Sequence, residues 1–327
     1  MPVRRTAPRG GIAHMKNINL AVVVLVLFTG INGCTFLKVN IGDEVEPLTE
    51  QVIAGRGADK VLVMDLSGII MGGESGSLLS DRKKPGLLAR VREVLDRARR
   101  DRHVKAVVLR INSPGGGVTA SDTLYHELKQ FRQETGVPMV AHIMDVGASG
   151  AYYASLAADA ITAQPTSLTG SIGVIMYRLD ATALMQKVGL QTTEISSGDR
   201  KSYGSPLRPL SDDERKLFQG VIDSLYERFT SLVAQERKLP PELVRKAADG
   251  RIFTSREARE AGLIDGIGYL EDAVELAKQK AKITEASVVM YLRPGEYRNN
   301  IYSFSLINVD LGAFAEPGAK FLYLWWP

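Results

Sequence analysis

The stretch Val104-Lys-Ala-Val-Val-Leu-Arg-Ile111, followed at once by Asn112-Ser-Pro-Gly-Gly-Gly-Val118, decides the fold of this chain. Its first half is mostly apolar and predicts a buried strand. Three consecutive glycines come after it, and they let the backbone approach a ligand closely and aim N–H groups at it. The stretch therefore predicts a strand that ends in a ligand-binding loop.

Strands and helices alternate on both sides of this stretch. Lys60–Ser67 and Pro138–Met144 have the composition of buried strands, whereas Pro85–Ala98 and Thr119–Glu134 carry apolar side chains at helical spacing. Such an alternation implies βαβ units and a largely parallel sheet. We therefore expect one α/β domain.

Gly147-Ala-Ser-Gly-Ala-Tyr-Tyr-Ala154 places a serine between small residues, at the start of an apolar run with helical character. Small neighbours let a substrate carbonyl approach, and a helix N-terminus offers free N–H groups to an oxyanion. A serine nucleophile needs a base. All four histidines precede Ser149: His14, His103, His126 and His142. The Ser…Asp…His order of an α/β-hydrolase is therefore excluded, and the base must be an upstream histidine, a carboxylate or a lysine.

Four motifs occur in a fixed order along the chain. They are Asn112-Ser-Pro-Gly-Gly-Gly117, Ala148-Ser-Gly150, Leu168-Thr-Gly-Ser-Ile-Gly-Val174 and the frame Ser-Gly-x-x-Lys-x-x-x-Ser-Pro at 197–206. Together they resemble the signal peptide peptidase A family of bacterial membrane-associated serine peptidases, over roughly Lys60 to Lys280. The resemblance implies a Clp/crotonase-like fold with repeated ββα units.

The same resemblance assigns roles to five residues. Ser149 would be the nucleophile, and Lys201 the general base that takes the serine proton and later returns it to the leaving amine. Ser171 would orient that base, and Gly116 and Gly150 would supply the backbone N–H groups of the oxyanion hole. Without the resemblance, each has an ordinary interpretation: a helix N-cap serine, a solvated lysine, a turn serine and two turn glycines.

Other interpretations remain open at this stage. His142 and Asp145 lie just ahead of Ser149 and could form a triad, although residues at a strand end more often have a structural role. The fold would also suit a crotonase-type acyl-CoA enzyme or a catalytically silent membrane scaffold. A secretory leader argues against the acyl-CoA enzyme, because CoA is cytosolic. The favoured function is an endopeptidase that degrades signal peptides and other hydrophobic, membrane-derived peptides.

The N-terminal region has the features of a secretory signal. A lysine near Met15 precedes an apolar run from Ile18 to Phe28 and the small-residue segment Thr29–Cys34. Ile31-Asn-Gly-Cys34 resembles a lipobox, which implies a lipid anchor on Cys34 at the extracytoplasmic side of a bacterial membrane. The alternative is an uncleaved anchor, since residues 17–37 carry no charge and about 20 residues span a bilayer.

Composition excludes several functional classes. Cys34 is the only cysteine, so we expect neither a disulfide framework nor a catalytic thiol. The leader contains four basic residues and no acidic ones; without it, 37 of the 41 basic residues remain against 37 acidic residues. The net charge of +4 thus belongs to the leader and gives no indication of nucleic-acid binding. No metal-binding motif is present, and we expect no metal or cofactor.

The expected organisation is a leader over 1–34, a polar tether over 35–59, the peptidase domain over 60–282 and an aromatic extension over 283–327. Within the domain, Ser211 and Glu214 form a capping-box pattern at the start of a long helix. The resemblance further implies a homo-oligomer that acts on peptides at a membrane.

A first prediction concerns the lipid anchor. A Cys34→Ala variant should leave the detergent phase in a phase-partition experiment, or remain as unprocessed precursor, because it cannot be lipidated. Unchanged partitioning and unchanged mass would favour the uncleaved anchor instead.

Overall fold

The computed structural model describes residues 46–72, 85–296, 300–302 and 320–325. The leader and Cys34 lie outside these ranges, so the expectations for residues 1–34 concern parts of the chain that are not described. None of the helices within the described ranges has both the length and the hydropathy needed to cross a bilayer.

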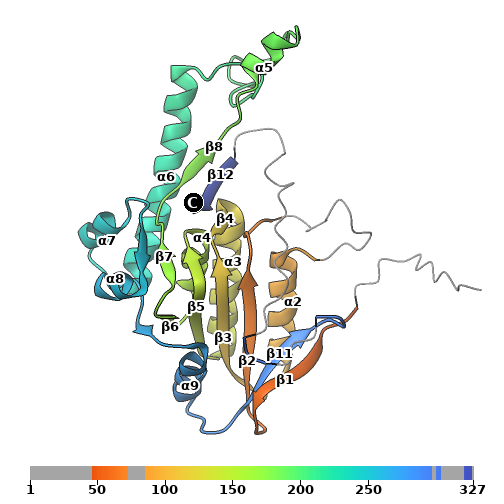
Figure 1. Cartoon of the computed structure of the whole chain (residues 1–327), viewed down its shortest axis with the longest axis vertical. Coiled ribbons are helices and arrows are strands. Elements are labelled where there is room, and N and C mark those ends of the chain that lie inside the picture. Colours follow the sequence, from red (N-terminus) through yellow and green to blue (C-terminus); the bar gives the residue numbers. More distant parts are fainter. Residues whose placement is uncertain (1–45, 73–84, 297–299, 303–319, 326–327) are drawn as a thin grey trace, which may run out of the picture. The chain divides into compact units, whose positions relative to one another are not determined.

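Helices and strands alternate over most of the described chain (Figure 1). The helices are α2 (Leu87–Arg100), α3 (Val118–Thr135), α4 (Gly150–Ser155), α5 (Thr182–Lys187), α6 (Asp212–Arg237), α7 (Pro241–Ala247), α8 (Ser255–Glu260) and α9 (Leu270–Ala281). The strands are β1 (Thr49–Gly55), β2 (Lys60–Ser67), β3 (Val104–Ser113), β4 (Gly115–Gly117), β5 (Met139–Ala148), β6 (Ala160–Ala163), β7 (Leu168–Gly170), β8 (Ile175–Tyr177), β9 (Ile252–Thr254), β10 (Gly266–Ile267), β11 (Ser287–Leu292) and β12 (Lys320–Leu324).

A large sheet forms the centre of the domain, with its main path in the order β1-β11-β2-β3-β5-β6-β10. All pairs along this path are parallel except β1 with β11. Strand β7 continues the sheet beside the end of β5, and β9 pairs with β7 in the antiparallel direction. The expected α/β fold with a largely parallel sheet is therefore confirmed.

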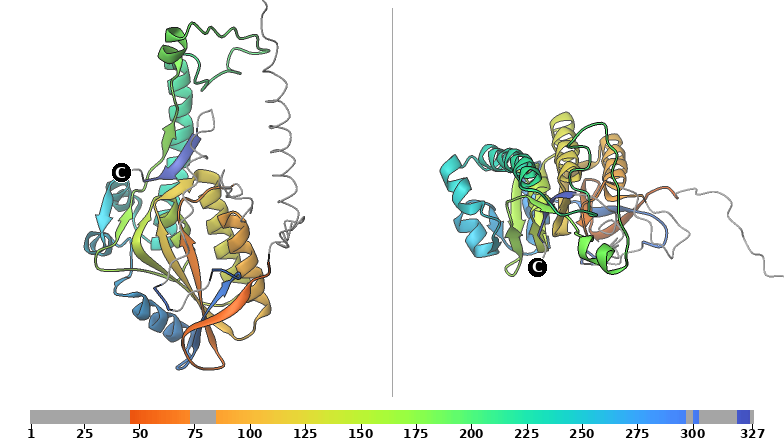
Figure 2. Two further views of the ribbon diagram at one scale, coloured as in Figure 1. Left: turned by 45° about the vertical axis from the view of Figure 1, so that its right-hand side comes forward. Right: turned by 90° about the horizontal axis from the view of Figure 1, so that it is seen from above.

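Each face of the sheet contacts its own helices (Figures 1 and 2). Alternate residues of β2 show why: Leu62 and Met64 pack in one core with side chains of α2, α3 and α4, whereas Val61 and Val63 pack in the other core against α9. Since successive side chains of a strand point to opposite faces, a strand apolar at every position is buried on both sides.

A smaller sheet contains the strands β4, β12 and β8, in that order. Both of its pairs are antiparallel, and it lies at the end of the domain where β3 and β5 finish (Figure 1). Its first strand consists of three glycines that lead directly into α3. Sequence analysis predicted a strand followed by a glycine loop; in the structure, the three glycines form the short strand β4 between β3 and α3.

The structure differs from the expected boundaries at both ends of the domain. Thr49–Gly55, expected within a tether, is strand β1, and Ser287–Leu292, expected within the extension, is strand β11. The two strands pair with each other, and β11 also pairs with β2. Pairing between segments so far apart in the sequence leaves no local pattern by which a boundary could be predicted.

A row of polar residues crosses the sheet on the face that α9 covers. In register, Asp65 on β2 lies beside Arg110 on β3, and Arg110 beside His142 on β5. The Arg110 guanidinium is fully buried, donates to the Asp65 carboxylate with an Nη2–Oδ2 distance of 2.8 Å, and also donates to the Ile301 carbonyl. This ion pair lies within an otherwise apolar core.

A second prediction follows from this buried pair. Arg110→Met should lower the free energy of unfolding by about 3–5 kcal/mol, because it leaves the Asp65 carboxylate buried without its cation. Urea unfolding monitored by circular dichroism would measure the change. The matched control is Lys216→Ala, whose pair with Asp213 joins side chains that are 80% and 82% exposed. The control should change stability by less than about 1 kcal/mol. An equal effect of the two substitutions would contradict the prediction.

Candidate active site

Ser149 lies between β5 and α4 in a conformation that is unusual for a serine. Its φ and ψ angles are 52° and −115°, outside the common region for a residue with a Cβ atom. Holding a non-glycine residue there costs on the order of 1–3 kcal/mol, and such strain is concentrated at functional sites. The residue is 1% exposed, and its hydroxyl makes no capping hydrogen bond to α4. The N-cap interpretation of Ser149 therefore does not fit the structure.

Ser171 lies beside Ser149 because their strands pair. Ala148 at the end of β5 is in register with Gly170 at the end of β7, and the Ser149 amide donates to the Gly170 carbonyl at 2.7 Å. Ser171 also has a positive φ, 48°, and is 7% exposed. Neither serine hydroxyl has a hydrogen-bond partner among the described residues. The site thus contains two buried serines with uncommitted hydroxyls.

Gly116 and Gly150 come together next to Ser149. A Cβ atom on Gly115 would lie 2.7 Å from the Gly150 nitrogen, so the glycine strand touches the first turn of α4. A Cβ on Gly116 would lie 1.9 Å from the carbonyl oxygen of Ile70, and one on Gly150 would lie 2.2 Å from Ser121 Oγ. A side chain at Gly116 would collide with backbone, and the close approach brings the glycine strand against the first turn of α4, directly after Ser149.

Lys201 is not brought to this site within one chain. It is exposed and lies between α5 and α6. Its backbone amide donates to the Gly198 carbonyl at 3.0 Å, whereas its side-chain amine makes no hydrogen bond or ion pair with any described residue. Helix α5 and the start of α6 form the outer end of an arm that points away from α4 (Figures 1 and 2). The expected hydrogen bond between the Lys201 amine and the Ser149 hydroxyl is absent from the described single chain.

The segment that carries Lys201 is fixed in place by Glu214, at the start of α6. The Glu214 carboxylate accepts hydrogen bonds from the amides of Gly204 and Ser211, at 3.0 and 2.9 Å, and from the Arg208 guanidinium at 2.9 Å. Burial alone would raise the pKa of Glu214, but these hydrogen bonds outweigh burial and lower that pKa to about 2.

Sequence analysis identified Glu214 as a capping residue, and the capping box with Ser211 is present. Its second role, holding Gly204 near Lys201, was missed. No local signal could have found this role, because the pattern of a capping box is the same whether or not the carboxylate also receives a loop amide.

His142 does not form a triad with Asp145 and Ser149. It is fully buried, its Nδ1 atom lies 2.8 Å from Thr162 Oγ1, and its Nε2 atom has no hydrogen-bond partner. Asp145 instead accepts a hydrogen bond from the side chain of Asn112, at 3.3 Å. The interpretation of His142 as a structural residue agrees with these contacts.

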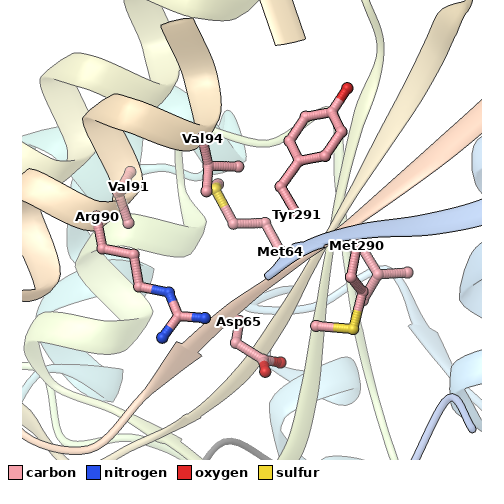
Figure 3. A pocket seen from close by; sticks show the side chains of 8 residues that line it. Met64, Asp65, Arg90, Val91, Val94, Met290 and Tyr291 are labelled. Carbon is pink, nitrogen blue, oxygen red and sulfur yellow. The ribbon is translucent and has the colours of Figure 1, made fainter. Parts of the chain in front are cut away.

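A small pocket of about 10 Å³ lies away from this site, between α2, β2 and β11 (Figure 3). Its lining includes Asp65, Arg90 and Tyr291, and its volume suits about one water molecule rather than a peptide. In the described ranges, no group of three His, Cys, Asp or Glu side chains is arranged to hold a metal ion. The serine site therefore remains the candidate for the chemistry.

A family model and several curated relatives indicate a peptidase. The profile of peptidase family S49 matches residues 131–284. A putative signal peptide peptidase SppA of Enterococcus faecium is 33% identical over 261 residues, covering 79% of this chain and 73% of that protein. A chloroplastic serine protease SPPA of Arabidopsis thaliana is 36% identical over 231 residues, which are 68% of this chain and 33% of that protein. Protease 4 of Salmonella typhi is 35% identical over 214 residues, which are 64% of this chain and 34% of that protein.

The chain therefore spans about a third of the last two relatives. Among solved structures, a ClpP1 mutant from Listeria monocytogenes matches with a TM-score of 0.41 and 17% identity, covering 66% of this chain and 95% of that one.

A third prediction concerns His142. Burial lowers its pKa from 6.5 to about 4, so the unfolded chain binds this proton more readily than the folded chain below pH 6.5. Stability should be unaffected by this group above pH 6.5 and should fall by up to about 1.4 kcal/mol per pH unit between pH 6.5 and 4.

A His142→Gln variant should lose this part of the acid dependence and keep its peptidase activity at neutral pH. Urea unfolding at a series of pH values, with a peptide assay at pH 7.5, would measure both. Loss of activity in a folded His142→Gln protein would restore the histidine as a candidate base.

Proposed function

Since the chain belongs to peptidase family S49, it is a serine peptidase, and we propose that Ser149 is its nucleophile and that Lys201 of a second copy is its general base. The observation that carries the proposal is the strained, buried Ser149, whose hydroxyl is not used for capping and whose neighbour Gly150 packs against the glycine strand.

The reaction is acyl transfer in two steps. The Lys201 amine takes the proton of the Ser149 hydroxyl as Oγ attacks the scissile carbonyl carbon. The N–H groups of Gly116 and Gly150 stabilise the negative charge on the carbonyl oxygen. The C–N bond then breaks, the leaving amine receives the proton from Lys201, and an ester on Ser149 remains. Water activated by the same lysine hydrolyses this ester. Ser171 orients the lysine amine.

The assignment to a second copy is supported by the position of Lys201 on the arm that points away from α4 (Figures 1 and 2). The Arg178 guanidinium donates to the Ser205 carbonyl at 2.6 Å, and the Ala181 amide donates to the Pro206 carbonyl at 2.8 Å. With the Glu214 hydrogen bonds, these contacts fix the Lys201 segment to the arm from both sides. The arm therefore presents Lys201 outward, toward a neighbour.

The arm also has the surface of an interface. Large apolar side chains are exposed on it: Leu179 (61%), Leu184 (63%), Val188 (59%), Leu190 (58%) and Ile195 (97%). Exposed apolar surface of this kind supports contact with a partner. A second copy would bury these side chains and would shield Lys201 from water, which favours the neutral amine that a base requires. The proposed assembly is a homo-oligomer with shared active sites.

We further propose that the substrates are hydrophobic peptides released at a membrane, signal peptides among them. The name of the Enterococcus faecium relative supports this substrate class. A lipid anchor on Cys34 would place the domain at the extracytoplasmic side of the membrane, close to such peptides.

A fourth prediction distinguishes a shared dyad from one formed within a chain. Ser149→Ala and Lys201→Ala should each reduce peptide hydrolysis by on the order of a thousandfold or more, because nucleophile and base act as a unit. When the two inactive variants are co-expressed in equal amounts, mixed oligomers should recover about a quarter of the wild-type activity, since half of the Ser149-bearing chains meet a Lys201-bearing neighbour. The rate of hydrolysis of a fluorogenic hydrophobic peptide would measure the activity of each variant and of the mixed oligomers.

The matched control is Lys187→Ala, which removes another exposed lysine from the arm and should keep full activity. A fluorophosphonate probe should label the wild type and Lys187→Ala, but not Ser149→Ala. If mixed oligomers, whose composition is confirmed by mass, recover no activity, the dyad is not shared between chains. Near-normal turnover of Lys201→Ala would exclude Lys201 as the base.

A further inference from the structure

One carboxylate joins the helix that follows Ser149 to the long helix of the arm. Asp122 lies on α3, and its Oδ1 atom accepts a hydrogen bond from the Tyr153 hydroxyl of α4 at 2.6 Å. The same oxygen accepts from the Arg228 guanidinium of α6, at 2.5 Å from Nη2 and 3.1 Å from Nε. Burial and the bond to Asp122 raise the pKa of Tyr153 well above its usual range, so its hydroxyl stays protonated and donates. A single oxygen atom thus links three helices.

Tyr153 holds the turn of chain that follows the proposed nucleophile. It lies one helical turn after Ser149, and its amide donates to the Ser149 carbonyl at 2.8 Å. Its ring is fully buried, so the side chain and the turn must move together. Ser121, next to Asp122, also touches this turn, since its Oγ atom would lie 2.2 Å from a Cβ atom on Gly150. Helix α3 therefore contacts the first turn of α4 at its start and at its end.

Arg228 lies far from the end of α6 that carries the Lys201 segment. Glu214 fixes that segment at the start of α6, and a rise of 1.5 Å per residue puts it roughly 20 Å from Arg228 along the helix axis. A tilt of α6 by about 10° at Arg228 would therefore move the Lys201 segment by about 3–4 Å. A base must lie within roughly 2.6–3.2 Å of the serine hydroxyl, so a shift of this size would separate the dyad.

A second ion pair between α3 and α6 provides a comparison. Lys129 donates to the Glu236 carboxylate at 2.8 Å, and within the described residues neither side chain forms a hydrogen bond or ion pair with α4. The Asp122 and Arg228 side chains are 35% and 57% exposed. Exposed ion pairs contribute little to stability, so the chain should stay folded when either pair is lost. The two pairs thus differ mainly in the contact of Asp122 with α4.

We propose that Asp122 is a positioning residue for the peptidase reaction. Through Tyr153 it holds the turn after Ser149. Through Arg228 it sets the direction in which the arm presents Lys201. The inference rests on the proposed function, since the arm must bring Lys201 to the serine of a second copy. In any one active site, the bond to Tyr153 then acts in the chain that provides the serine, and the bond to Arg228 acts in the chain that provides the lysine.

The first test compares full-length variants that are folded and oligomeric. Asp122→Ala should lower kcat by on the order of ten- to a hundredfold and leave KM within about twofold, because it misplaces the reacting groups and keeps the substrate contacts. Asp122→Glu, which restores a carboxylate, should recover most of this loss. The matched control, Lys129→Ala, should keep the wild-type kcat. A wild-type kcat in Asp122→Ala, or an equal loss in Lys129→Ala, would overturn the proposal.

The second test assigns each half of the contact to its chain. In mixed oligomers of Ser149→Ala and Lys201→Ala chains, each active site takes its lysine from the first chain and its serine from the second. Arg228→Ala should reduce the recovered activity by on the order of tenfold when it is placed in the Ser149→Ala chain, and should have little effect in the Lys201→Ala chain. Tyr153→Phe should show the reverse. Equal losses from both placements would contradict the assignment.

The third test does not depend on catalysis. Spin labels on Lys105→Cys and Lys187→Cys, two exposed positions on the core and on the arm, report the orientation of the arm in full-length protein that also carries Cys34→Ser. Pulsed dipolar spectroscopy on labelled chains, diluted with unlabelled ones, measures the distance between the labels. The distribution of distances should shift or broaden by a few ångströms in Asp122→Ala and stay unchanged in Lys129→Ala. An unchanged distribution in Asp122→Ala would overturn the role of Asp122.

These outcomes separate the inference from the proposed function. If the wild type hydrolyses no peptide but the label distance changes in Asp122→Ala, then Asp122 holds the arm and the peptidase mechanism at Ser149 is rejected. Normal hydrolysis together with an unchanged label distance would keep the peptidase and reject the role of Asp122.

Discussion

The close packing of backbone against backbone at the glycine strand is the constraint on which the rest of the structure depends. Gly116 lies so near the Ile70 carbonyl that no side chain fits, since a Cβ atom would lie 1.9 Å from its oxygen, and a Cβ atom on Gly115 would lie 2.7 Å from the Gly150 nitrogen. This packing joins the ends of β2, β3 and β5 at one place, next to Ser149. The strained backbone of Ser149 is tolerated because the pairing of β5 with β7 fixes both neighbouring segments.

The two faces of the large sheet have different roles in this arrangement. The face covered by α9 holds the buried row of Asp65, Arg110 and His142, which contributes to stability and makes no contact with the serine site. The other face supports α3 and α4, the two helices that begin at the glycine strand and at Ser149. The orientation of the strands thus separates the polar groups used for the fold from those proposed for catalysis.

Residues around the serine are buried, whereas the arm that carries Lys201 is exposed and apolar. On the proposed mechanism, Ser149 would gain its base only from a second copy, so the isolated chain would lack a complete site. Activity would then depend on contacts between copies, in addition to the chemistry of the dyad.

Local patterns in the sequence determined much of the architecture. Three kinds of local pattern are present in the structure: apolar strands followed by glycine, helical spacing in α2 and α3, and the capping box of α6. Each depends on residues within one or two turns of each other. Family membership was also recognisable, because the four motifs keep their order in the chain. The grouping of Ser149, Ser171, Gly116 and Gly150 followed from those motifs.

Tertiary structure alone decided the partners of segments far apart in the sequence. Three such features leave no periodic signal in the sequence: the pairing of β1 with β11, the insertion of β12 between β4 and β8, and the separation of Lys201 from Ser149. Hydrogen bonds between distant strands impose no spacing on the residues in between. The sequence by itself determined which residues could carry the chemistry, and the folded chain decided which of them meet.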